Sequence, residues 1–428
     1  MADPDVTSLE RRVVGKVSRR LLPYLFLLYV VAYLDRVNVG VAHLQITRDR
    51  PIADSDWGLG VGLFFSGYFL FEVPSNLILA RVGARVWIAR IMVVWGLVSI
   101  SMIFIRGAWD FFMLRFLLGV AEAGFFPGIL FYLTRWFRKE DRARAIALFM
   151  TAGTVTGVIG NPLSGSLLGL DGVAGLKGWQ WLFLLEGLPA IVLGVSVLFL
   201  LTERPETAAW LSPPERDWLV GELKRAQEKA EGGPAPSLLE TLSQPRVLLL
   251  GGIYFLVASG GHAFEFWLPD IVKSIIGQDA FRVTLVSAIP YLIATVVMIV
   301  AAHHSDRTGE RKWHVAIAAF AAAAGFGAAG FLGNPILILG ALSIGWSGVK
   351  ALQAPFWAIP PTFLSGTRSA AGMALINSVG NLGGQVGPWA MGAFLAGSRG
   401  YAAGLRFSAT LLLAAGVTTL GLRVLRNR

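Results

Sequence analysis

The stretch Tyr33-Leu34-Asp35-Arg36-Val37-Asn38 organises the chain, because it places an acid, a base and an amide inside an apolar run from Leu21 to about His43. A run of this length crosses a lipid bilayer, which needs about 20 mostly apolar residues. A charged side chain at such a depth costs about 2.5 to 3.5 kcal/mol on insertion scales, so it normally faces a bundle interior or a watery cavity. The sequence therefore predicts a membrane helix whose charged residues serve a function.

The composition extends this prediction to the whole chain. The 428 residues are 55% hydrophobic, only 15% charged and include 50 glycines, which is typical of a polytopic membrane protein rather than of a soluble domain. There is no cysteine, so disulfides and thiolate metal sites are excluded. We expect no cofactor and no metal, because the sequence has no phosphate-binding loop, no metal-spaced histidine cluster and no nucleophile elbow.

The net charge of +10 reflects membrane topology rather than nucleic-acid binding. If the chain crosses the membrane twelve times, the loops on the side of the termini carry 26 Lys and Arg residues, and the loops on the other side carry 8. Cytoplasmic loops are the ones that carry an excess of positive residues. We therefore expect both termini in the cytoplasm, a multi-pass protein of the plasma membrane (the inner membrane of a bacterium), and no nucleic-acid partner.

Twelve apolar runs are long enough to be membrane helices, which predicts an all-α fold. They cover residues 21–43, 57–80, 86–105, 111–134, 143–168, 179–201, 247–271, 283–304, 314–332, 335–358, 370–395 and 402–423. Between the sixth and seventh runs lies a polar interval with a charged, helical-looking segment and then Gly232-Gly233-Pro234. We expect an N-terminal six-helix half over residues 1–201, a flexible cytoplasmic linker over 202–244 and a C-terminal six-helix half over 245–428.

A repeated basic turn indicates that the two halves are related. The second run is followed by Arg81, Gly83 and Arg85, and the eighth by Asp306, Arg307, Gly309 and Arg311, with the shared spacing Arg-x-Gly-x-Arg. Basic turns are common at a membrane surface. Their recurrence at equivalent positions of two six-helix halves, however, is typical of transporters built from internal repeats.

These paired turns resemble the Gly-x-x-x-Asp-Arg-x-Gly-x-Arg loop of the major facilitator superfamily. Further segments are similar to its anion:cation symporter family, namely Tyr33-Leu34-Asp35-Arg36-Val37-Asn38, Phe71-Glu72-Val73-Pro74-Ser75-Asn76, Arg115 through Glu122 to Pro127, Phe266-Trp267-Leu268-Pro269 and Asn377-Ser378-Val379-Gly380-Asn381. The resemblance runs from about Leu22 to Leu422. One departure is Ala80, at the position of the loop's Asp, which removes the acid of an ion pair at the first turn; Asp306 supplies one at the second.

The resemblance implies a fold, an activity and roles for three residues. The fold is that of the major facilitator superfamily, with alternating access. The activity is proton-coupled uptake of organic anions such as sugar acids, tartrate or aromatic acids. Asp35 and Glu122 are implied to be the proton-coupling groups, and Arg36 is implied to contact the substrate anion.

Four charged residues from two apolar runs are expected to meet inside the bundle. At 1.5 Å of rise per residue, Asp35 lies roughly 21 Å from the cytoplasmic edge, and Arg115, on a run that enters from the other side, reaches nearly the same depth. Glu122 lies two turns beyond Arg115 on nearly the same face. A fixed ion-pair network that only packs the bundle is the alternative, but desolvation makes it a poor source of stability. We expect the arginine forks to bind a carboxylate, Glu122 to be weakly paired, and Asp35 to be held by Arg36 and Arg115.

Other polar positions in the apolar runs are weaker candidates for substrate contacts: Tyr33, Tyr68, His262, Lys350, Gln353, Trp357, Asn377 and Asn381. Lys350 begins a polar stripe at spacings i, i+3 and i+7, although it could instead extend to water along its own stem. Asn377 and Asn381 are one turn apart, which suits either hydroxyl recognition or close packing of a small-residue face. Glu265 shares a face with His262 and either selects the substrate or reaches water at an interface.

The sequence therefore predicts a secondary transporter, not an enzyme, which imports a small organic carboxylate by proton symport and works as a monomer in the bilayer. The first alternative is an anion exchanger or uniporter of the same fold, in which Asp35 and Glu122 only hold the arginines. A membrane substrate sensor and an intramembrane enzyme are remote alternatives. Arg36 alone fits a monocarboxylate, whereas Arg36 together with Lys350 also fits a dicarboxylate.

Overall fold

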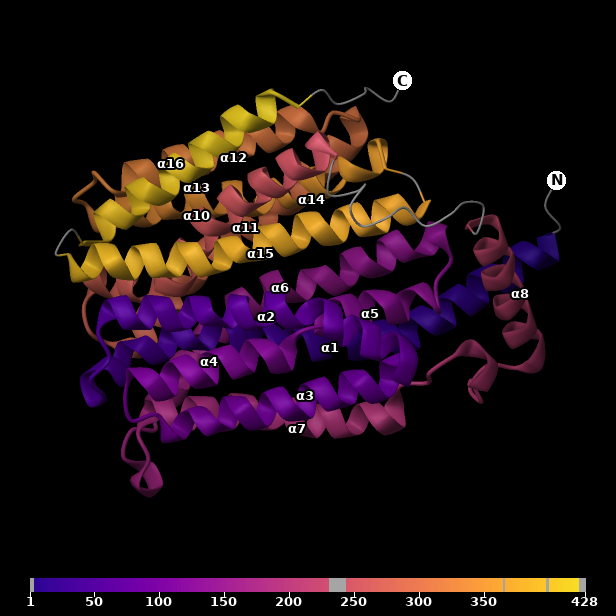
Figure 1. The fold of residues 1–428 in the computed structure, drawn as a ribbon, viewed down its shortest axis with the longest axis horizontal. Helices are drawn as coiled ribbons and strands as arrows, with labels where there is room; N and C mark the ends of the chain where they lie inside the picture. The colour runs from indigo at the N-terminus through magenta and orange to yellow at the C-terminus, as the bar shows by residue number, and fades with distance from the viewer. Residues whose placement is uncertain (1–3, 231–243, 365, 398–399, 423–428) are drawn as a thin grey trace.

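The computed structural model describes residues 4–230, 244–364, 366–397 and 400–422, and this described part consists of helices and their short connections (Figure 1). The long helices run side by side. Helix α8 (Pro213–Ala230) lies at one end of the bundle, which we call the linker end. Helix α1 (Pro4–Asp49) begins at the linker end and finishes at the other end of the bundle, which we call the opposite end.

The remaining helices follow in the order expected from the apolar runs. Before the linker they are α2 (Asp54–Val82), α3 (Ala84–Ser101), η1 (Met102–Phe104), α4 (Ala108–Glu122), α5 (Phe125–Thr134), α6 (Lys139–Leu168), η2 (Val173–Gly175), α7 (Gly178–Leu200) and η3 (Pro205–Thr207). After it come α10 (Pro245–Ile276), α11 (Ala280–Thr308), α12 (Lys312–Ala329), α13 (Pro335–Ala351), α14 (Gln353–Trp357), η4 (Pro360–Thr362), α15 (Gly366–Ala396) and α16 (Gly400–Leu420).

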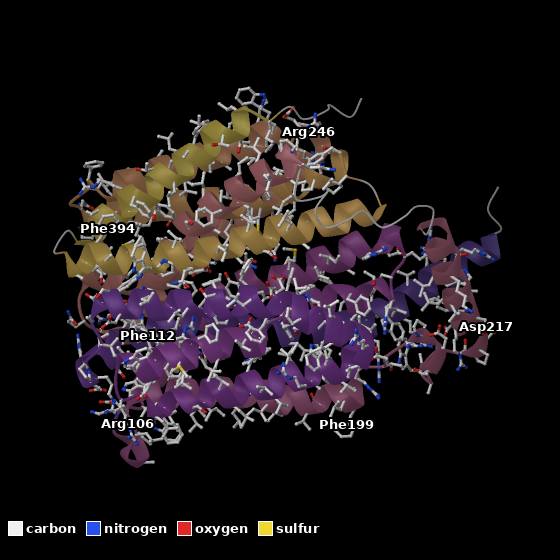
Figure 2. The ribbon with its side chains drawn as sticks, viewed as in Figure 1. Arg106, Phe112, Phe199, Asp217, Arg246 and Phe394 are labelled. Carbon is white, nitrogen blue, oxygen red and sulfur yellow. The ribbon has the colours of Figure 1, made fainter. Side chains whose placement is uncertain are left out.

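The all-α membrane fold predicted from the sequence is confirmed. Ten helical segments of the described residues are long and apolar enough to cross a membrane. Helices α6 and α15, with 30 and 31 residues, occupy the places of the fifth and eleventh predicted runs. Apolar side chains on the outside of the bundle, such as Phe199 with 80% of its surface exposed, point away from it (Figure 2). This is the arrangement that a hydrocarbon solvent favours, because lipid tails are as apolar as these side chains.

Two of the membrane-crossing segments are broken in the middle by a proline. Pro127 has no N–H to offer the carbonyl of Ala123, four residues earlier, and the hydroxyl of Ser75 donates to that carbonyl instead, at 2.6 Å. The chain turns through Gly124, whose φ of 89° suits a glycine, so α4 ends at Glu122 and α5 starts at Phe125. Pro355 likewise separates α13 from α14. The sequence predicted each of these two segments as one uninterrupted run.

The expectation of a flexible linker does not hold for its first part. Helix α1 starts at Pro4, well before the predicted Leu21, and its extra turns pack against α8. Lys16 Nζ lies 2.8 Å from Glu215 Oε2, and the guanidinium of Arg138 lies over the ring of Trp218, 5.3 Å from its centroid. The final part of the linker, 231–243, lies outside the described residues. Its first part is therefore fixed to the helices that precede it.

Helices on the two sides of the linker pack closely through glycines. Helix α2 packs against α15, as the adjacent purple and orange ribbons show (Figure 1). In the same way α6 packs against α11, and α1 against α10. At Gly40 of α1, a Cβ atom would lie 2.6 Å from the carbonyl oxygen of Phe266 on α10. Such small residues let membrane helices approach closely enough for backbone contact. The central charged residues of α1 and α10 are thereby brought together.

Candidate functional site

The centre of the bundle contains an acid and base pair that joins Arg36, from the stretch 33–38, to Glu122 of α4. The side chain of Arg36 on α1 is 22% exposed, and its Nη2 forms an ion pair and hydrogen bond with Oε1 of Glu122, the last residue of α4, whose side chain is only 3% exposed. The arginine is thus the more accessible partner. A ligand carboxylate can approach this guanidinium while the glutamate remains buried beside it.

The pairing of acids and bases differs from the one expected from the sequence. Glu122, expected to be weakly paired, has Arg36 as its partner. Asp35, expected to be held by the arginines, instead accepts hydrogen bonds from Ser99 Oγ and, at 3.5 Å, from Asn38 Nδ2. Within the described part of the chain, its Oδ2 has no hydrogen-bond partner. The rotation of each helix about its axis, which hydropathy does not determine, sets these partners.

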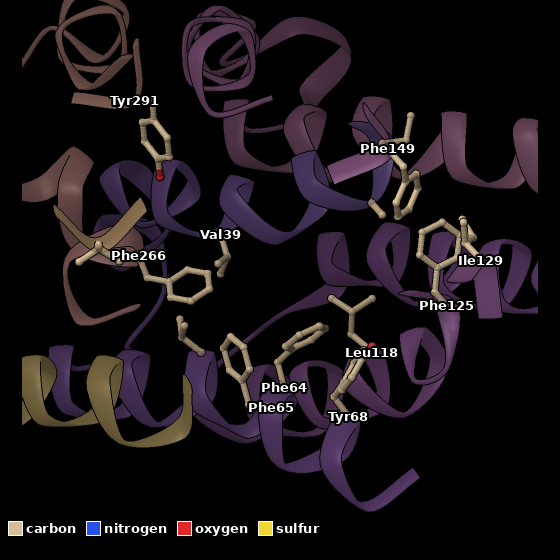
Figure 3. Packing of buried hydrophobic residues seen from close by; sticks show 14 of the residues in the cluster. Val39, Phe64, Phe65, Tyr68, Leu118, Phe125, Ile129, Phe149, Phe266 and Tyr291 are labelled. Atoms are coloured by element: carbon tan, nitrogen blue, oxygen red, sulfur yellow. The ribbon is translucent and has the colours of Figure 1, made fainter. Parts of the chain in front are cut away.

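Arg115 and Arg36 are both stacked on the same aromatic ring. The guanidinium carbons lie 5.0 Å and 5.3 Å from the centroid of Phe64, on α2. Arg36 is also 5.9 Å from the ring of Tyr68, one turn further along α2, and Figure 3 shows these aromatic side chains packed together with Phe65. Arg115 is almost fully buried and donates to the backbone carbonyl of Val61 at 3.4 Å. The aromatic faces stabilise the two cations where water is scarce.

A second charged cluster joins α1 to helices that follow the linker. The Tyr33 hydroxyl donates to Oε1 of Glu265 on α10, whose Oε2 lies 2.9 Å from His262 Nδ1. Lys350 Nζ, on α13, donates to the Tyr33 hydroxyl at 3.4 Å and lies 4.2 Å from the ring centroid of Trp346. Lys350 is only 8% exposed. It therefore does not extend to water along its stem, and Glu265 faces the protein interior.

The remaining predicted contacts lie nearer the linker end. Glu72 on α2 accepts hydrogen bonds across the interface with α15, from Asn377 Nδ2 at 3.4 Å and from Ser378 Oγ at 3.3 Å. Asn381 is half-buried one turn further along α15. The predicted stripe of Lys350, Gln353 and Trp357 is interrupted, because the break at Leu352 separates Lys350 from the other two. Trp357 packs on Tyr254, 5.2 Å between ring centroids.

The two basic turns have different acidic partners. At the second turn Arg311 Nη1 lies 2.7 Å from Asp306 Oδ1, as the sequence allows, while Gly309 ends α11 with a φ of 67° and Arg307 is exposed. At the first turn the missing acid is replaced from elsewhere in the chain. The carboxylate of Glu203 accepts from the backbone N–H groups of Ala84 and Arg85, at 2.9 and 2.8 Å, just beyond Gly83 with its φ of 103°. Arg81 is exposed in the last turn of α2.

Two further buried groups were not anticipated from the sequence. At the opposite end, His43 of α1 lies 2.7 Å from Asp270 Oδ2 on α10 and 3.3 Å from Asp54 Oδ1 on α2, between the rings of Trp57 and Trp267. Glu186 of α7 accepts from Ser164 Oγ at 2.6 Å, and its Oε2 has no hydrogen-bond partner among the described residues. Asp35 stands out in the sequence because it is an acid inside an apolar run. The same signal would have pointed to Glu186 and Asp270 as buried acids.

The chain is similar to known transporters over nearly its whole length. Two proteins of Agrobacterium vitis, each described as a putative tartrate transporter, are 48% and 47% identical over 96% and 97% of this chain and 91% and 95% of their own lengths. A putative metabolite transport protein of Pseudomonas putida, NicT, is 41% identical over 91% of this chain and 89% of its own.

Solved structures show the same fold at low sequence identity. A crystal structure of a bacterial homologue of the human lysosomal transporter Spinster covers 94% of this chain and 95% of its own, with a TM-score of 0.76 and 19% identity. An inward-open structure of the xylose transporter XylE from Escherichia coli covers 97% of this chain and 98% of its own, with a TM-score of 0.76 and 13% identity.

The match to a family model agrees with these relatives and with the helical architecture described above. The model of the Major Facilitator Superfamily matches residues 25–388, which include both central charged clusters. The chain belongs to the Major Facilitator Superfamily, and it is a multi-pass membrane transporter rather than an enzyme.

Proposed function

We propose that this protein imports a small organic anion into a bacterial cell by symport with protons, and that the anion binds at Arg36. The observation that carries the proposal is the Arg36–Glu122 ion pair, in which the guanidinium is the more exposed partner. An arginine fork binds a carboxylate through two parallel hydrogen bonds. The two relatives from Agrobacterium vitis, described as putative tartrate transporters, support an organic acid as the substrate.

Coupling to protons follows from competition for Arg36. A substrate carboxylate that takes the guanidinium leaves Glu122 as a buried negative charge without its ion-pair partner. Burying an uncompensated carboxylate is costly, and uptake of a proton removes the charge. Substrate binding and protonation of Glu122 therefore favour each other. Asp35, which is buried with one oxygen unpartnered, is proposed as the second proton-coupling group.

Alternating access requires that the two ends of the bundle open in turn. At the opposite end, the His43 contacts with Asp270 and Asp54 join α1, α2 and α10. Nearby, Lys273 Nζ donates to the Leu44 carbonyl at 3.5 Å, and Arg48 donates to Gln278. We propose that this is the periplasmic end, and that these contacts separate when the substrate enters. The linker end is then cytoplasmic, as its excess of Lys and Arg indicates.

The Glu122→Gln variant tests the coupling, because the amide mimics the protonated acid. In vesicles loaded with tartrate, this variant should exchange internal for external labelled tartrate at a rate within about threefold of wild type, since the neutral amide no longer competes for Arg36. It should not accumulate tartrate when an inward proton gradient is imposed. Glu222→Gln, on α8 and paired with Arg225, is the matched control and should accumulate tartrate normally.

The outcomes separate the proposed symport from its alternative. Accumulation at the wild-type level by Glu122→Gln would remove Glu122 from the coupling step. If wild-type uptake itself ignores the pH gradient, the protein is an anion exchanger or uniporter and the acids only hold the arginines. The proton gradient is thus the variable that decides between the two functions.

A further inference from the structure

The two central clusters have matching positions in the two sets of six membrane helices. In the first set, the base Arg36 is on the first helix, α1, and the acid Glu122 is on the fourth, at the end of α4. In the second set, the acid Glu265 is on the first helix, α10, and the base Lys350 is on the fourth, at the end of α13. Each set thus contributes one acid and one base. The base is on the first helix of the first set but on the fourth helix of the second set, and the acid has the opposite placement.

The chain around the fourth helices repeats as well. Pro127 follows Glu122 by five residues, and Pro355 follows Lys350 by five. In both places the missing N–H of proline breaks the helix just after the charged residue. Lys350 lies in the last turn of α13, where the helix dipole favours a positive charge. The structure therefore places a stabilised cation at the position that corresponds to Glu122.

Each of the two cations is connected to a carboxylate of the protein, one directly and one through a tyrosine. Arg36 is paired with Glu122 directly. Lys350 is connected to Glu265 through the Tyr33 hydroxyl, which donates to the carboxylate and accepts from Nζ at 3.4 Å. Tyr33 and Arg36 are one turn apart on α1, which puts their Cβ atoms about 5 to 6 Å apart. Tyr33, which contacts Lys350, and Arg36 are therefore neighbours on one face of α1.

We propose that Lys350 is a second anion-binding group and that the substrate is a short dicarboxylate, which bridges Arg36 and Lys350 in place of Glu122 and Glu265. This rests on the proposed function, because it assigns the second pole of the same site. The two negative ends of the substrate satisfy both cations at once, whereas a monocarboxylate leaves Lys350 with Tyr33 and Glu265. Tyr33 then acts as the hydrogen-bonding group that Lys350 releases when the dianion binds.

The test compares L-tartrate with its monoamide, which has the same carbon skeleton and one carboxylate fewer. Affinities are measured by calorimetry on the purified full-length protein. Wild type should bind tartrate at least about tenfold more tightly than the monoamide, as expected for one additional buried hydrogen-bonded charge pair. Lys350→Gln should lose this preference, because its affinity for tartrate falls while its affinity for the monoamide is unchanged. Lys350→Arg should keep it, and Lys312→Gln, a lysine at the start of α12 away from the site, should behave as wild type.

A second variant is expected to raise the affinity for tartrate rather than lower it. Glu265→Gln removes the carboxylate that competes for Lys350, so tartrate should bind about threefold more tightly or better, with little change for the monoamide. If this cluster had only a structural role, Glu265→Gln would bind both tartrate and the monoamide more weakly. Binding of the monoamide by each variant also shows that the protein is folded.

The possible failures have different meanings. If Lys350→Gln keeps the preference for tartrate, Lys350 is not the second pole. If wild type binds glycerate and the monoamide as tightly as tartrate, the substrate is a monocarboxylate; the dicarboxylate inference is then wrong, although transport of an organic anion stands. If succinate, malate, tartrate and glycerate all fail to bind, both the inference and the proposed function are overturned.

Discussion

At the scale of single residues, the chemistry of the site depends on which cation meets which carboxylate. Arg36 is paired with Glu122 and stacked on Phe64 and Tyr68, so its guanidinium is held in one plane. Asp35, its neighbour in the chain, points elsewhere and is hydrogen-bonded to Ser99 and Asn38. Adjacent residues on a helix point about 100° apart, so an acid and a base that are neighbours in sequence do not pair here.

Replacing Arg36 by lysine should weaken substrate binding by at least about tenfold, or about 1.4 kcal/mol. Lysine keeps the charge but has neither the planar fork that binds a carboxylate bidentately nor the flat face that stacks on Phe64. Calorimetry with tartrate measures the effect. Arg106→Lys, in the connection between α3 and α4, is the control and should bind normally. Near-normal affinity of Arg36→Lys would move the anion site to another cation.

At the scale of helices, the notable features are the breaks after Glu122 and Lys350 and the docking of α8. Each break places a charged residue at the end of a helix, in the middle of a membrane-crossing segment. In an unbroken helix the same residue would lie on the side of the helix. The docking of α8 depends on Glu215, whose buried carboxylate contacts Lys16 at 2.8 Å and accepts from the backbone N–H of Ser212 at 2.9 Å. Glu215 is thus one of the residues that fasten the described part of the linker to the bundle.

The attachment of α8 should weaken in acid. The hydrogen bond from Lys16 lowers the pKa of Glu215 below its usual value of 4.5. A carboxylate with a lowered pKa in the folded protein stabilises it above the unfolded pKa, and this contribution is lost as the pH falls through the folded value. Cleavage within the segment 202–230 by an acid-active protease, such as pepsin, should therefore speed up below about pH 4.5.

The Glu215→Gln variant should show loosened docking already at neutral pH. Removing a partly exposed ion pair costs about 1 kcal/mol at most, so the trypsin cleavage rate at neutral pH should rise by up to about fivefold. Glu222→Gln, on the same helix, should be cleaved as wild type. Equal cleavage of all three proteins at neutral pH would show that other contacts hold α8.

At the scale of the whole molecule, the structure is closed at the opposite end. The contacts of His43, Lys273 and Arg48 connect α1 to α10 and to the residues just after it. They depend on a buried histidine between two acids, and such a cluster is strongly weakened when one member is removed, because the remaining charges stay buried without a partner.

The closure can be measured by cross-linking, because the natural chain has no cysteine. A bifunctional maleimide should cross-link the pair Arg48→Cys and Gln278→Cys, which replaces two residues in contact across the opposite end. Adding His43→Ala should lower the cross-linking rate by at least about threefold, since losing a buried ionic partner costs several kcal/mol. His303→Gln, exposed near the linker end of α11, should leave the rate unchanged. An unchanged rate in His43→Ala would assign the closure to apolar packing.

The orientation of the bundle gives a further test. Reporter fusions after Arg428 and within the linker at Gly233 should both be active in the cytoplasm, because the loops on that side carry 26 of the Lys and Arg residues and the other loops carry 8. A fusion within the connection between α1 and α2, near Ile52, should be active only outside the cytoplasm. An outside signal at Arg428 would overturn the count of twelve spans.

The sequence alone determined the helical membrane fold, because each membrane helix satisfies its own backbone hydrogen bonds and only needs a long enough apolar run. It also predicted functional roles for Asp35, Arg36, Arg115 and Glu122, because charges inside such runs are rare. The three-dimensional packing determines which of them pair, places Lys350 in the interior, and joins Lys350 to α1 through Glu265 and Tyr33. These contacts depend on the rotation of each helix, on the proline breaks and on close approach at glycines such as Gly40. The contacts themselves join residues far apart in the chain, so no local pattern encodes them.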